Sequence, residues 1–595
     1  MSALSELRRM PEARMGALAP LRQVGVRAGA TTLAKAAWRS RLQRAELGRH
    51  ALLAYWETLG EREAIIDGDR RISFSEYRER VLCFANALYL LGLTSGDRFA
   101  ELLYNGSTWF EAMGAGTLMG IQMPMLNWHL RADELAHCIN ISEPKALLFD
   151  IEFLDKIEAI RSKIPTVQHF IVVGTDSPPE GMLAYKQLLA EARPELPPGK
   201  LDMAPRPFSG GTTGTPKFMN INRERLAHGS DEDRRGASKE EVTRLGLMQL
   251  TAFYWYKLGE IEDAITHNVR SLIPGPLYHA GVQVGVLPFF VGGTVVPMRK
   301  FSAEGFLRLI EEERINWTFV APTMLERVLA LPETIQQQYN LSSMRTIICA
   351  AAPCSPKVKR EINALFRRQG AKDDVFHEYY AASETGLVTI LAPEDYQANP
   401  KRYESVGKVR GCECRIYDEA SQSWCPPGKE GKVLLRTPTV FGLEYAGMDE
   451  AAMRKNFVEV NGQLWYDDGL IGYLDEDGYL YLTSRVKEMI ISGGVNIFPN
   501  EIEEVIKRHP KVLDVAVVRA PDKDLGEVPA AVIQLKEGEQ ATSAEIMEHC
   551  KQAGLYGFKL PKIVDFVEQL PRNLAGKLPK KQLEEQYWQG LERHG

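Results

Sequence analysis

A ten-residue stretch near the middle of the chain has the composition of a phosphate-binding loop. It runs from Phe208 to Lys217 and reads Phe-Ser-Gly-Gly-Thr-Thr-Gly-Thr-Pro-Lys. Glycine lets the backbone approach a ligand closely, and successive N–H groups around glycine form a concave anion site. Hydroxyl groups add donors, and a lysine neutralises charge on a leaving phosphate. A solvated linker would explain the Gly and Ser residues, but not two adjacent threonines followed by Pro-Lys.

This loop is not the P-loop of the nucleoside triphosphatases, in which glycine directly precedes the lysine. Pro216 stands at that position here. We expect Lys217 to act as a catalytic cation on the leaving phosphates. The residues expected to contact phosphate are Ser209, Gly210, Gly211, Thr212, Thr213 and Gly214.

A second candidate segment, Tyr379–Gly386, follows a predicted strand at Val375–Tyr379. Open α/β sheets bind ligands at the carboxyl ends of their strands. Glu384 could hold Mg²⁺ there, because oxygen atoms are its preferred ligands, while Ser383 would donate to phosphate. Taken alone, Ser383 would more simply be a helix N-cap, and only the phosphate loop favours the site.

Two further segments carry candidate residues. The predicted strand Thr346–Pro353 ends in three alanines, which leave room for a flat ligand or for tight helix–strand packing. The proline-rich segment Pro274–Gly281 presents His279 beside the apolar stretch Val282–Val296. His279 is therefore either a structural histidine or a gate to a pocket.

The elements that must position these residues alternate as strand and helix from residue 51 to about 200, which predicts a mostly parallel sheet and an α/β fold. A solvated insertion is expected at Ser230–Glu241, which is dense in both charges. The predicted elements of the first part are strands at Arg71–Phe74, Arg98–Leu103, Lys145–Phe149 and His169–Val173, and an amphipathic helix at Ser75–Leu91.

A second, small α/β domain is predicted near the end of the chain. It follows a hairpin at Gly472–Leu482, whose Asp-Gly turn is flanked by alternating aromatic and aliphatic residues. Pro499 opens a helix with acidic residues early and basic residues late, which suits the helix dipole. Strands Val512–Val518 and Ala530–Leu535, a helix at Ser543–Gln552 and an exposed loop with Lys577 complete this domain.

The composition sets limits on partners and location. The chain has 595 residues, a net charge of −6 and eight scattered cysteines, which indicates a reducing compartment and gives no sign of nucleic-acid binding. The first fifty residues hold ten basic and three acidic side chains. This segment is not a secretory signal; it would lie on an anionic membrane surface or cap the folded domain. The apolar run Ala280–Met298 contains four glycines, which favours a buried helix and strand over a membrane span.

Together these motifs resemble the adenylate-forming superfamily of acyl- and aryl-CoA synthetases, adenylation domains and luciferases. The resemblance spans about residues 50 to 590 and rests on the phosphate loop, the carboxylate segment, the hairpin, a hinge and a terminal Gly-Lys pair. Gly210-Gly-Thr-Thr-Gly and Lys487–Gly494 are most similar to bacterial fatty-acid and steroid-side-chain acyl-CoA synthetases. The resemblance implies a large N-terminal domain of stacked α/β subdomains and a small mobile C-terminal domain.

The implied reaction has two halves. A carboxylate attacks the α-phosphate of ATP with Mg²⁺, and a thiol, usually that of CoA, then displaces AMP. Lys577 would bridge the carboxylate and the α-phosphate, Lys487 would be the hinge, and Arg485 would reach the ribose. Besides the phosphate loop, the residues implied to bind ATP or CoA are Ala351, Ala352, Pro353, Tyr379, Tyr380, Ser383, Asp468, Arg485, Lys487, Gly493 and Gly494.

Two positions depart from the family pattern. Leu470 stands where the family has an aspartate that holds the ribose hydroxyls, and Ser484 replaces the aspartate before the arginine. An apolar side chain cannot accept a hydrogen bond, and losing a charge-assisted one costs about 1.5–3 kcal/mol. Asp468, two residues earlier, would substitute if the loop is shifted.

The sequence therefore predicts an ATP-dependent acyl-CoA ligase that acts on a hydrophobic carboxylic acid, in fatty-acid or lipid metabolism. One alternative acceptor is a carrier protein or an intramolecular alcohol, as in β-lactone synthetases; another alternative is a catalytically impaired adenylate-binding protein. We expect a cytoplasmic protein, with contact to the inner membrane face and a homodimer as further expectations. The expected parts are a basic extension at 1–50, an adenylation core at 51–484 and a mobile domain at 485–595.

Overall fold

The computed structural model describes most of the chain after residue 45. The predictions for the basic N-terminal segment, Gly210–Gly214, Pro353, Lys487, Gly493, Gly494 and Lys577 lie outside the described residues. Of Ser209 and Arg485, only the backbone is described. The described residues are Met10, 46–209, 217–258, 269–279, 282–352, 354–446, 448–485, Glu488, 490–492, 495–497, 499–522, 525–555, 557–572 and 578–588.

The chain divides into two compact units. The large unit contains residues 1–413, 436–455 and 461–464, and the small unit contains residues 414–435, 456–460 and 465–595. The helices of the large unit are α5 (Leu47–Leu59), α6 (Phe74–Leu90), α7 (Ser107–Met119), α8 (Ala132–Ser142), α9 (Leu154–Glu158), α10 (Tyr185–Glu191), α11 (Arg223–His228), α12 (Lys239–Gln249), α13 (Thr251–Trp255), α14 (Val282–Gly285), α15 (Leu287–Phe290), α16 (Ala303–Glu312), α17 (Pro322–Leu329), α18 (Glu333–Gln336), α19 (Pro356–Arg368), α20 (Pro393–Ala398), α21 (Pro438–Gly442) and α22 (Glu450–Arg454).

The main sheet of the large unit is parallel in its centre and antiparallel at its edges. Its strands follow one another in space as β17-β16-β15-β14-β13-β11-β12-β1-β2. The strands from β15 to β1 are mutually parallel, whereas β2, β16 and β17 pair antiparallel. The bounds are β1 (Glu63–Asp67), β2 (Arg70–Ser73), β11 (Arg270–Ile273), β12 (Thr294–Pro297), β13 (Trp317–Val320), β14 (Thr346–Cys349), β15 (Phe376–Ala382), β16 (Gly386–Leu391) and β17 (Gly407–Val409).

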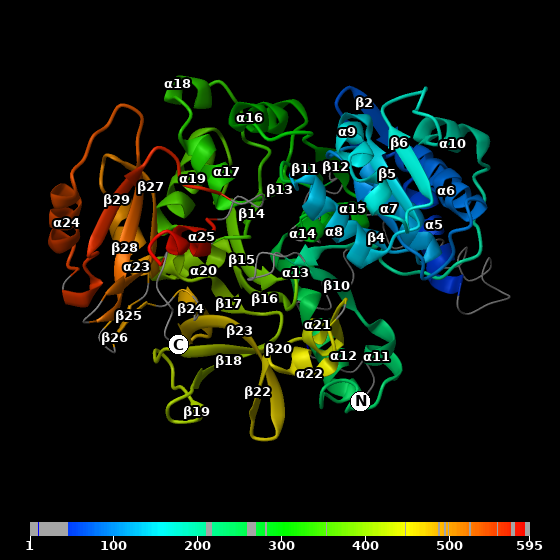
Figure 1. Cartoon of the computed structure of the whole chain (residues 1–595). Helices are drawn as coiled ribbons and strands as arrows, with labels where there is room; N and C mark the ends of the chain where they lie inside the picture. The colour runs from blue at the N-terminus through cyan, green and yellow to red at the C-terminus, as the bar shows by residue number, and fades with distance from the viewer. Residues whose placement is uncertain are drawn as a thin grey trace. The chain divides into compact units, whose positions relative to one another are not determined.

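Both faces of this sheet are buried, because neighbouring residues of its strands enter different cores. Ile66, Val296 and Ile347 pack in one core with α16, α17 and α19. The residues beside them, Ile65 and Val295, pack with α5, α6, α7 and α15. A parallel strand that is covered on both faces reads as a continuous apolar run, which is why these strands are short and rich in Ile and Val. Figure 1 shows α16, α17 and α19 together beside this sheet.

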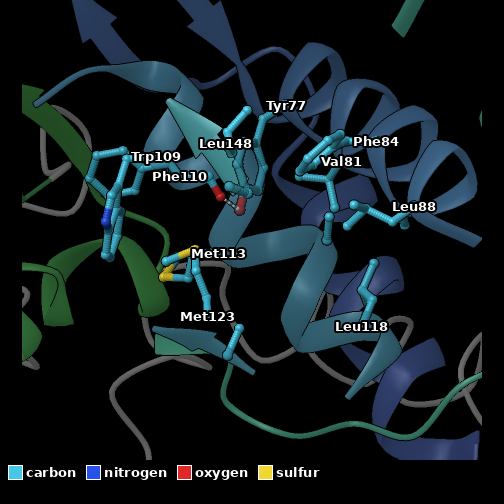
Figure 2. Close-up of a cluster of buried hydrophobic side chains, with 14 of the residues drawn as sticks. Tyr77, Val81, Phe84, Leu88, Trp109, Phe110, Met113, Leu118, Met123 and Leu148 are labelled. Carbon is cyan, nitrogen blue, oxygen red and sulfur yellow. Dashed lines mark hydrogen bonds between the residues drawn. The ribbon is translucent and has the colours of Figure 1, made fainter. Parts of the chain in front are cut away.

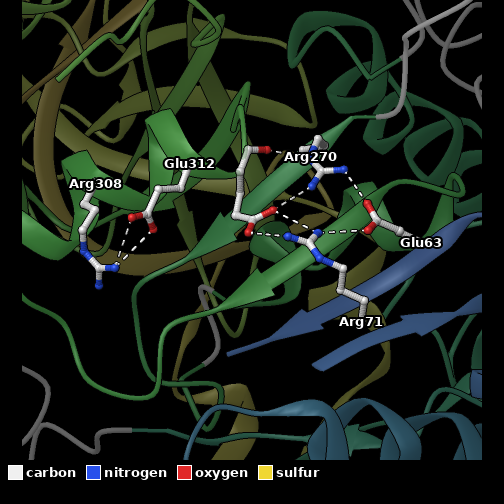
Figure 3. Close-up of polar contacts among 6 residues, drawn as sticks. Glu63, Arg71, Arg270, Arg308 and Glu312 are labelled. Atoms are coloured by element: carbon white, nitrogen blue, oxygen red, sulfur yellow. Dashed lines mark hydrogen bonds and ion pairs between the residues drawn. The ribbon is translucent and has the colours of Figure 1, made fainter. Parts of the chain in front are cut away.

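The amino ends of the parallel strands are joined by a ring of charges (Figure 3). Arg270 donates to Glu63 Oε2 at 2.8 Å and to Glu313 Oε2 at 3.0 Å. Arg71 closes the ring through Glu63 Oε1 at 2.9 Å and Glu313 Oε1 at 2.8 Å. Each pair is at least partly exposed to solvent and contributes little alone, but the four side chains tie β1, β2 and β11 to the residue after α16.

A second, parallel sheet has the order β3-β5-β6-β7, and α6 and α7 pack beside it (Figure 2). Tyr77 on α6 donates to the carbonyl oxygen of Phe110 on α7 at 3.0 Å. A Cβ atom at Gly114 would lie 2.4 Å from the Tyr77 hydroxyl, so this close helix contact requires glycine. The strands are β3 (Phe99–Leu102), β5 (Ala146–Asp150), β6 (His169–Val173) and β7 (Leu183–Ala184), with β4 (Met123–Pro124) and β8 (Pro205–Arg206) forming a separate parallel pair.

The small unit has two sheets. The first has the order β19-β18-β20-β23-β24, with β22 paired to β23, and the second has the order β26-β25-β28-β27, with β29 paired to β28. The elements are β18 (Glu413–Asp418), β19 (Ser423–Trp424), β20 (Gly431–Arg436), β22 (Phe457–Val460), β23 (Gln463–Leu474), β24 (Tyr479–Arg485), β25 (Ile490–Ser492), β26 (Val495–Ile497), α23 (Pro499–Lys507), β27 (Val512–Asp522), β28 (Gly526–Leu535), α24 (Ser543–Gln552), β29 (Ile563–Val567) and α25 (Lys580–Glu585).

The apolar run that begins at Ala280 forms α14, α15 and β12 over its described residues. This confirms the prediction of buried helix and strand for that stretch. Among the described residues, no helix combines the length and the apolarity that crossing a bilayer would need.

Candidate active site

Four neighbouring parallel strands end along one edge of the main sheet. β11, β13, β14 and β15 pair in that order, and parallel strands present their carboxyl ends on the same side. His279 follows β11, Ala351 and Ala352 follow β14, and Ser383 and Glu384 follow β15. The fold therefore brings together, at one edge, candidates that lie up to about a hundred residues apart in the sequence.

The turn that carries Ser383 and Glu384 joins β15 to β16 and is held by the side chains around it. The backbone N–H of Ala382 donates to Thr385 Oγ1 at 3.0 Å, and Thr385 is fully buried. Gln249, the last residue of α12, donates to the carbonyl of Leu387 and accepts from its N–H, both at 3.0 Å. These contacts hold in place the turn that presents the Glu384 carboxylate, and the turn is not the start of a helix.

Lys217 begins strand β10 (Lys217–Ile221), which lies between β9 (Phe208–Ser209) and β21 (Leu443–Tyr445) in a small antiparallel sheet. Lys217 pairs with Ser209, so the predicted phosphate loop leaves and re-enters the sheet at paired positions. On the other side of β10, Met219 pairs with Tyr445. The lysine and this tyrosine are therefore presented by neighbouring strands.

Tyr445 contacts both charged residues of the predicted site. Its hydroxyl donates to Glu384 Oε1 at 2.7 Å. The Lys217 ammonium lies over its ring, 5.6 Å from the centroid. Tyr445 is not predicted from the sequence, since it belongs to no motif and lies 61 residues from Glu384. Only the pairing of β10 with β21 could have revealed it.

The expectation of a solvated insertion at Ser230–Glu241 holds for most of the segment, whose residues are largely exposed, but Arg234, Arg235 and Ala237 are buried. Arg235 is 1% exposed; its guanidinium donates to Glu450 Oε1 at 2.9 Å and to the carbonyl of Leu443 at 2.8 Å. Arg234 is 4% exposed and donates to the carbonyl of Ala237 at 3.0 Å. A guanidinium can be buried when carboxylates and carbonyls satisfy its five donors, and the charge density alone did not predict those partners. The segment contacts β21 through Arg235 and contains the start of α12, and both elements support the site.

The loop with His279 is held by Asn105, which is also not predicted from the sequence. Asn105 is 5% exposed; its amide donates to the carbonyl of Gly275 at 2.7 Å and accepts from Leu277 N–H at 2.8 Å. The N–H of His279 then donates to the Pro276 carbonyl at 3.1 Å. His279 is half-buried, at the end of a turn that is tied to the start of α7.

The two tyrosines of β15 and the alanines after β14 have different surroundings. Tyr379 packs against Phe319 and Tyr256, with ring centroids 6.1 and 6.2 Å away. Because successive side chains of a strand point to opposite faces, Tyr380 lies on the other face of the sheet. Ala351 has a φ of +74°, a backbone conformation that alanine rarely adopts, and Ala352 is exposed.

In the small unit, Asp468 lies in a bulge of β23. Lys432 pairs with Ile471 and Leu434 pairs with Asp467, which leaves extra residues on β23 around Gly469, whose φ is +71°. Burial, together with the negative charge of Asp468, raises the pKa of the Cys414 thiol to about 12. Both a loop shift relative to the family and the role of Asp468 toward a nucleotide stay predictions.

The segments on both sides of the predicted loop with Lys577 are anchored within the small unit. Arg572 forms an ion pair with Asp514 on β27. Lys580 at the start of α25 forms ion pairs with Glu503 on α23 at 2.8 Å and with Glu488 at 3.0 Å.

The surroundings of Glu384, the candidate metal ligand, bear on whether it can bind Mg²⁺. No group of three His, Cys, Asp or Glu side chains suited to a metal occurs in the described part of the chain. Mg²⁺ that is bound together with a polyphosphate needs only one or two carboxylates, since phosphate and water oxygens fill the other positions. Glu384 fits this use, because Tyr445 occupies one of its oxygens and no described residue donates to the other.

Two family models match successive parts of the chain. The model of the AMP-binding enzyme family matches residues 54–443, and that of the AMP-binding enzyme C-terminal domain matches residues 501–577. A long-chain-fatty-acid–CoA ligase of Thermus thermophilus is 30% identical over 536 residues, 87% of this chain and 90% of that protein. The fatty acid–[acyl-carrier-protein] ligase ScoC of Streptomyces coeruleorubidus is 28% identical over 540 residues, 88% of this chain and 93% of that protein.

Among solved structures, ATP-bound MatB from Rhodopseudomonas palustris superimposes with a TM-score of 0.72 at 26% identity, covering 90% of this chain and 98% of that one. Other solved structures that resemble this chain share its mixed α/β fold, with a large N-terminal and a C-terminal domain.

Proposed function

The chain belongs to the AMP-binding enzyme family and is an ATP-dependent, AMP-forming ligase, and we propose that it activates a hydrophobic carboxylic acid and transfers the acyl group to the thiol of CoA. In the first half, a carboxylate oxygen of the acid bonds to the α-phosphorus of ATP while the bond to the β-phosphate oxygen breaks, which releases pyrophosphate. In the second half, the thiol attacks the acyl carbon, AMP leaves and the thiol proton goes to solvent.

The observation that carries this proposal is the joint placement of Lys217 and Glu384 around Tyr445. A reaction that expels pyrophosphate needs positioning and charge neutralisation more than acid–base catalysis. Lys217 would hold the leaving phosphates, Ser383 would donate to phosphate, and Glu384 would hold Mg²⁺. The bound Mg²⁺ would supply further neutralisation of phosphate charge.

The other predicted roles stay part of the proposal. Thr212 and Thr213 would bind phosphate, Tyr380 would stack near adenine, and Arg485 with Asp468 would bind the ribose. Lys577 would act in the first half-reaction, and the loop with Gly493 and Gly494 in the second, after rotation at Lys487. His279 would gate the acyl site from the end of β11.

An apolar cluster that includes residues of β13 and β14 and packs against β15 supports a hydrophobic acid as the substrate. It includes Trp317, Phe319, Ala350, Ile348 and Leu387, with Tyr379 packed against it. The names of the two relatives also support an acyl substrate, but they differ in the acceptor, which is CoA in one and a carrier protein in the other. A carrier protein in trans is therefore the second candidate acceptor, beside an intramolecular alcohol.

The test follows pyrophosphate release from ATP with a panel of fatty, aromatic and sterol-side-chain acids, each with and without CoA. We expect pyrophosphate with at least one hydrophobic acid, and CoA-dependent release of AMP. Pyrophosphate without CoA-dependent AMP release would favour the other acceptors. No pyrophosphate with any acid and no ATP binding would instead support an impaired adenylate-binding protein, the reading that Leu470 and Ser484 motivate.

A further inference from the structure

Lys217 and Glu384 carry opposite charges and face the same tyrosine, yet they do not pair with each other. Within the described residues, no ion pair joins them. The contact of each is instead Tyr445, through its ring for Lys217 and through its hydroxyl for Glu384. The face of an aromatic ring attracts a cation, and a phenol O–H makes a strong hydrogen bond to a carboxylate.

We propose that Tyr445 is a positioning residue that keeps Lys217 and Glu384 apart and aims both at the polyphosphate. This inference rests on the proposed function. A direct ion pair would occupy the lysine and the carboxylate, and an incoming nucleotide would have to break it. With Tyr445 between them, the ammonium keeps its donors for phosphate, and Glu384 keeps one oxygen that no described residue uses.

The backbone around Tyr445 makes it suitable as a spacer. Tyr445 lies on β21, opposite Met219 on the strand that begins at Lys217, and Ala446 N–H donates to the Phe218 carbonyl at 3.0 Å. The distance between lysine and tyrosine is therefore set by one antiparallel register. Buried Arg235 also holds β21, since it donates to the Leu443 carbonyl at 2.8 Å.

The segment after β21 is fixed in the same way. Glu450 forms ion pairs with Arg235 at 2.9 Å and with Arg225 at 3.3 Å. Glu444 forms a further ion pair with Arg225 at 3.3 Å. Through Arg235, the largely exposed insertion thus acts on the site by way of β21. This gives a physical reason for burying one arginine of a segment whose composition suggests solvent.

The test removes the hydroxyl but keeps the ring. For Tyr445→Phe we expect binding of ATP in the presence of Mg²⁺ to weaken about tenfold, because the carboxylate loses its hydrogen bond and turns toward Lys217. Binding of ATP in EDTA should change less than twofold. Calorimetry with the full chain measures both dissociation constants, and the acid-dependent pyrophosphate exchange should fall in kcat more than it rises in KM for the acid.

A matched control is Tyr339→Phe, since the Tyr339 hydroxyl donates to Glu304 Oε1 at 3.0 Å on an exposed surface of the same unit. This variant should bind ATP as the wild type does. Thermal unfolding midpoints of both variants show whether the comparison is between equally folded proteins. If Tyr445→Phe does not fold, Tyr445→Trp, which keeps a ring below Lys217, replaces it.

A double-mutant cycle separates positioning from general stability. In a Glu384→Gln background, Tyr445→Phe should have no further effect on the binding of ATP with Mg²⁺. An undiminished effect in that background, or equal weakening in EDTA, would overturn the proposal. If the proposed function fails, the wild-type protein itself will lack ATP binding and pyrophosphate exchange, so the two failures are distinguishable.

Discussion

Asp468 and Leu470 bear on the proposed binding of the nucleotide. By its resemblance to the family, the sequence has Leu470 where an aspartate is expected, and β23 carries a bulge at this point, with Gly469 at a φ of +71°. A bulge re-aims the side chains of its strand. The Asp468 carboxylate is therefore a candidate to replace the missing one, from a different position in the strand.

We expect Asp468→Asn to weaken ATP binding about tenfold, because a neutral amide accepts the ribose hydroxyls less strongly than a carboxylate. Leu470→Asp, added to that variant, should restore part of the affinity. Calorimetric titration with ATP measures both changes. Asp467→Asn is the control, since Asp467 faces Lys432 at 3.3 Å and accepts from Gly469 N–H at 2.8 Å. Unchanged binding by Asp468→Asn would rule out the substitution of one aspartate by the other.

At the scale of elements, β3 carries a carboxyl group whose ionised form is disfavoured by burial. Glu101 is 0% exposed; one oxygen accepts from Leu103 N–H at 3.0 Å, and the Trp109 side chain lies beside the carboxyl group. Burial raises the pKa of Glu101 to about 8. Since the folded-state pKa lies above the ordinary value of 4.5, the folded protein binds the proton more tightly between these two values.

The free energy of unfolding should therefore fall as the pH rises from about 4.5 to 8, and Glu101→Gln should remove this loss. We expect the variant to unfold close to the wild-type midpoint at pH 5 and at a higher urea concentration than the wild type at pH 8. Urea titrations at both pH values measure this, with the exposed Glu79→Gln as control. An equal difference at pH 5 and pH 8 would contradict the assignment.

The elements that local sequence determines were predicted well. The helix at Ser543–Gln552 and the strand at His169–Val173 have the predicted bounds, and the Asp-Gly hairpin forms between β23 and β24. Caps, periodicity and turn residues lie within a few positions of one another, so the sequence contains them directly. The placement of Glu384 at the carboxyl end of a strand followed from its position just after the predicted strand Val375–Tyr379.

What could not be predicted depends on contacts between distant segments. Tyr445 reaches Glu384 through the pairing of β21 with β10, and Arg235 is buried only because Glu450 and two backbone carbonyls meet it. A charged segment is usually solvated, and its composition cannot show which partners the fold will bring. The site was thus predictable as a set of motifs, but not as a connected structure.

At the scale of the whole molecule, the two half-reactions should depend on different segments of the C-terminal domain. We expect Lys577→Ala to slow acyl-adenylate formation by about 10²–10³ and to leave thioester formation from a supplied acyl-adenylate nearly normal, since the lysine would act only in the first half. Pyrophosphate release and AMP release measure the two halves separately.

The control for Lys577→Ala is Lys581→Ala, because Lys581 is exposed on α25. It should behave as the wild type in both half-reactions. Equal losses of both half-reactions in Lys577→Ala would show that the C-terminal lysine has no selective role in the first.

The alanine after β14 has one more consequence. Holding Ala351 at a φ of +74° costs about 1–2 kcal/mol that a glycine would avoid. In return, alanine has fewer conformations open to it than glycine has. The conformational entropy of this part of the loop is therefore lost when the chain folds, and a flat ligand bound beside the strand ends, as we propose, would have little of it left to remove.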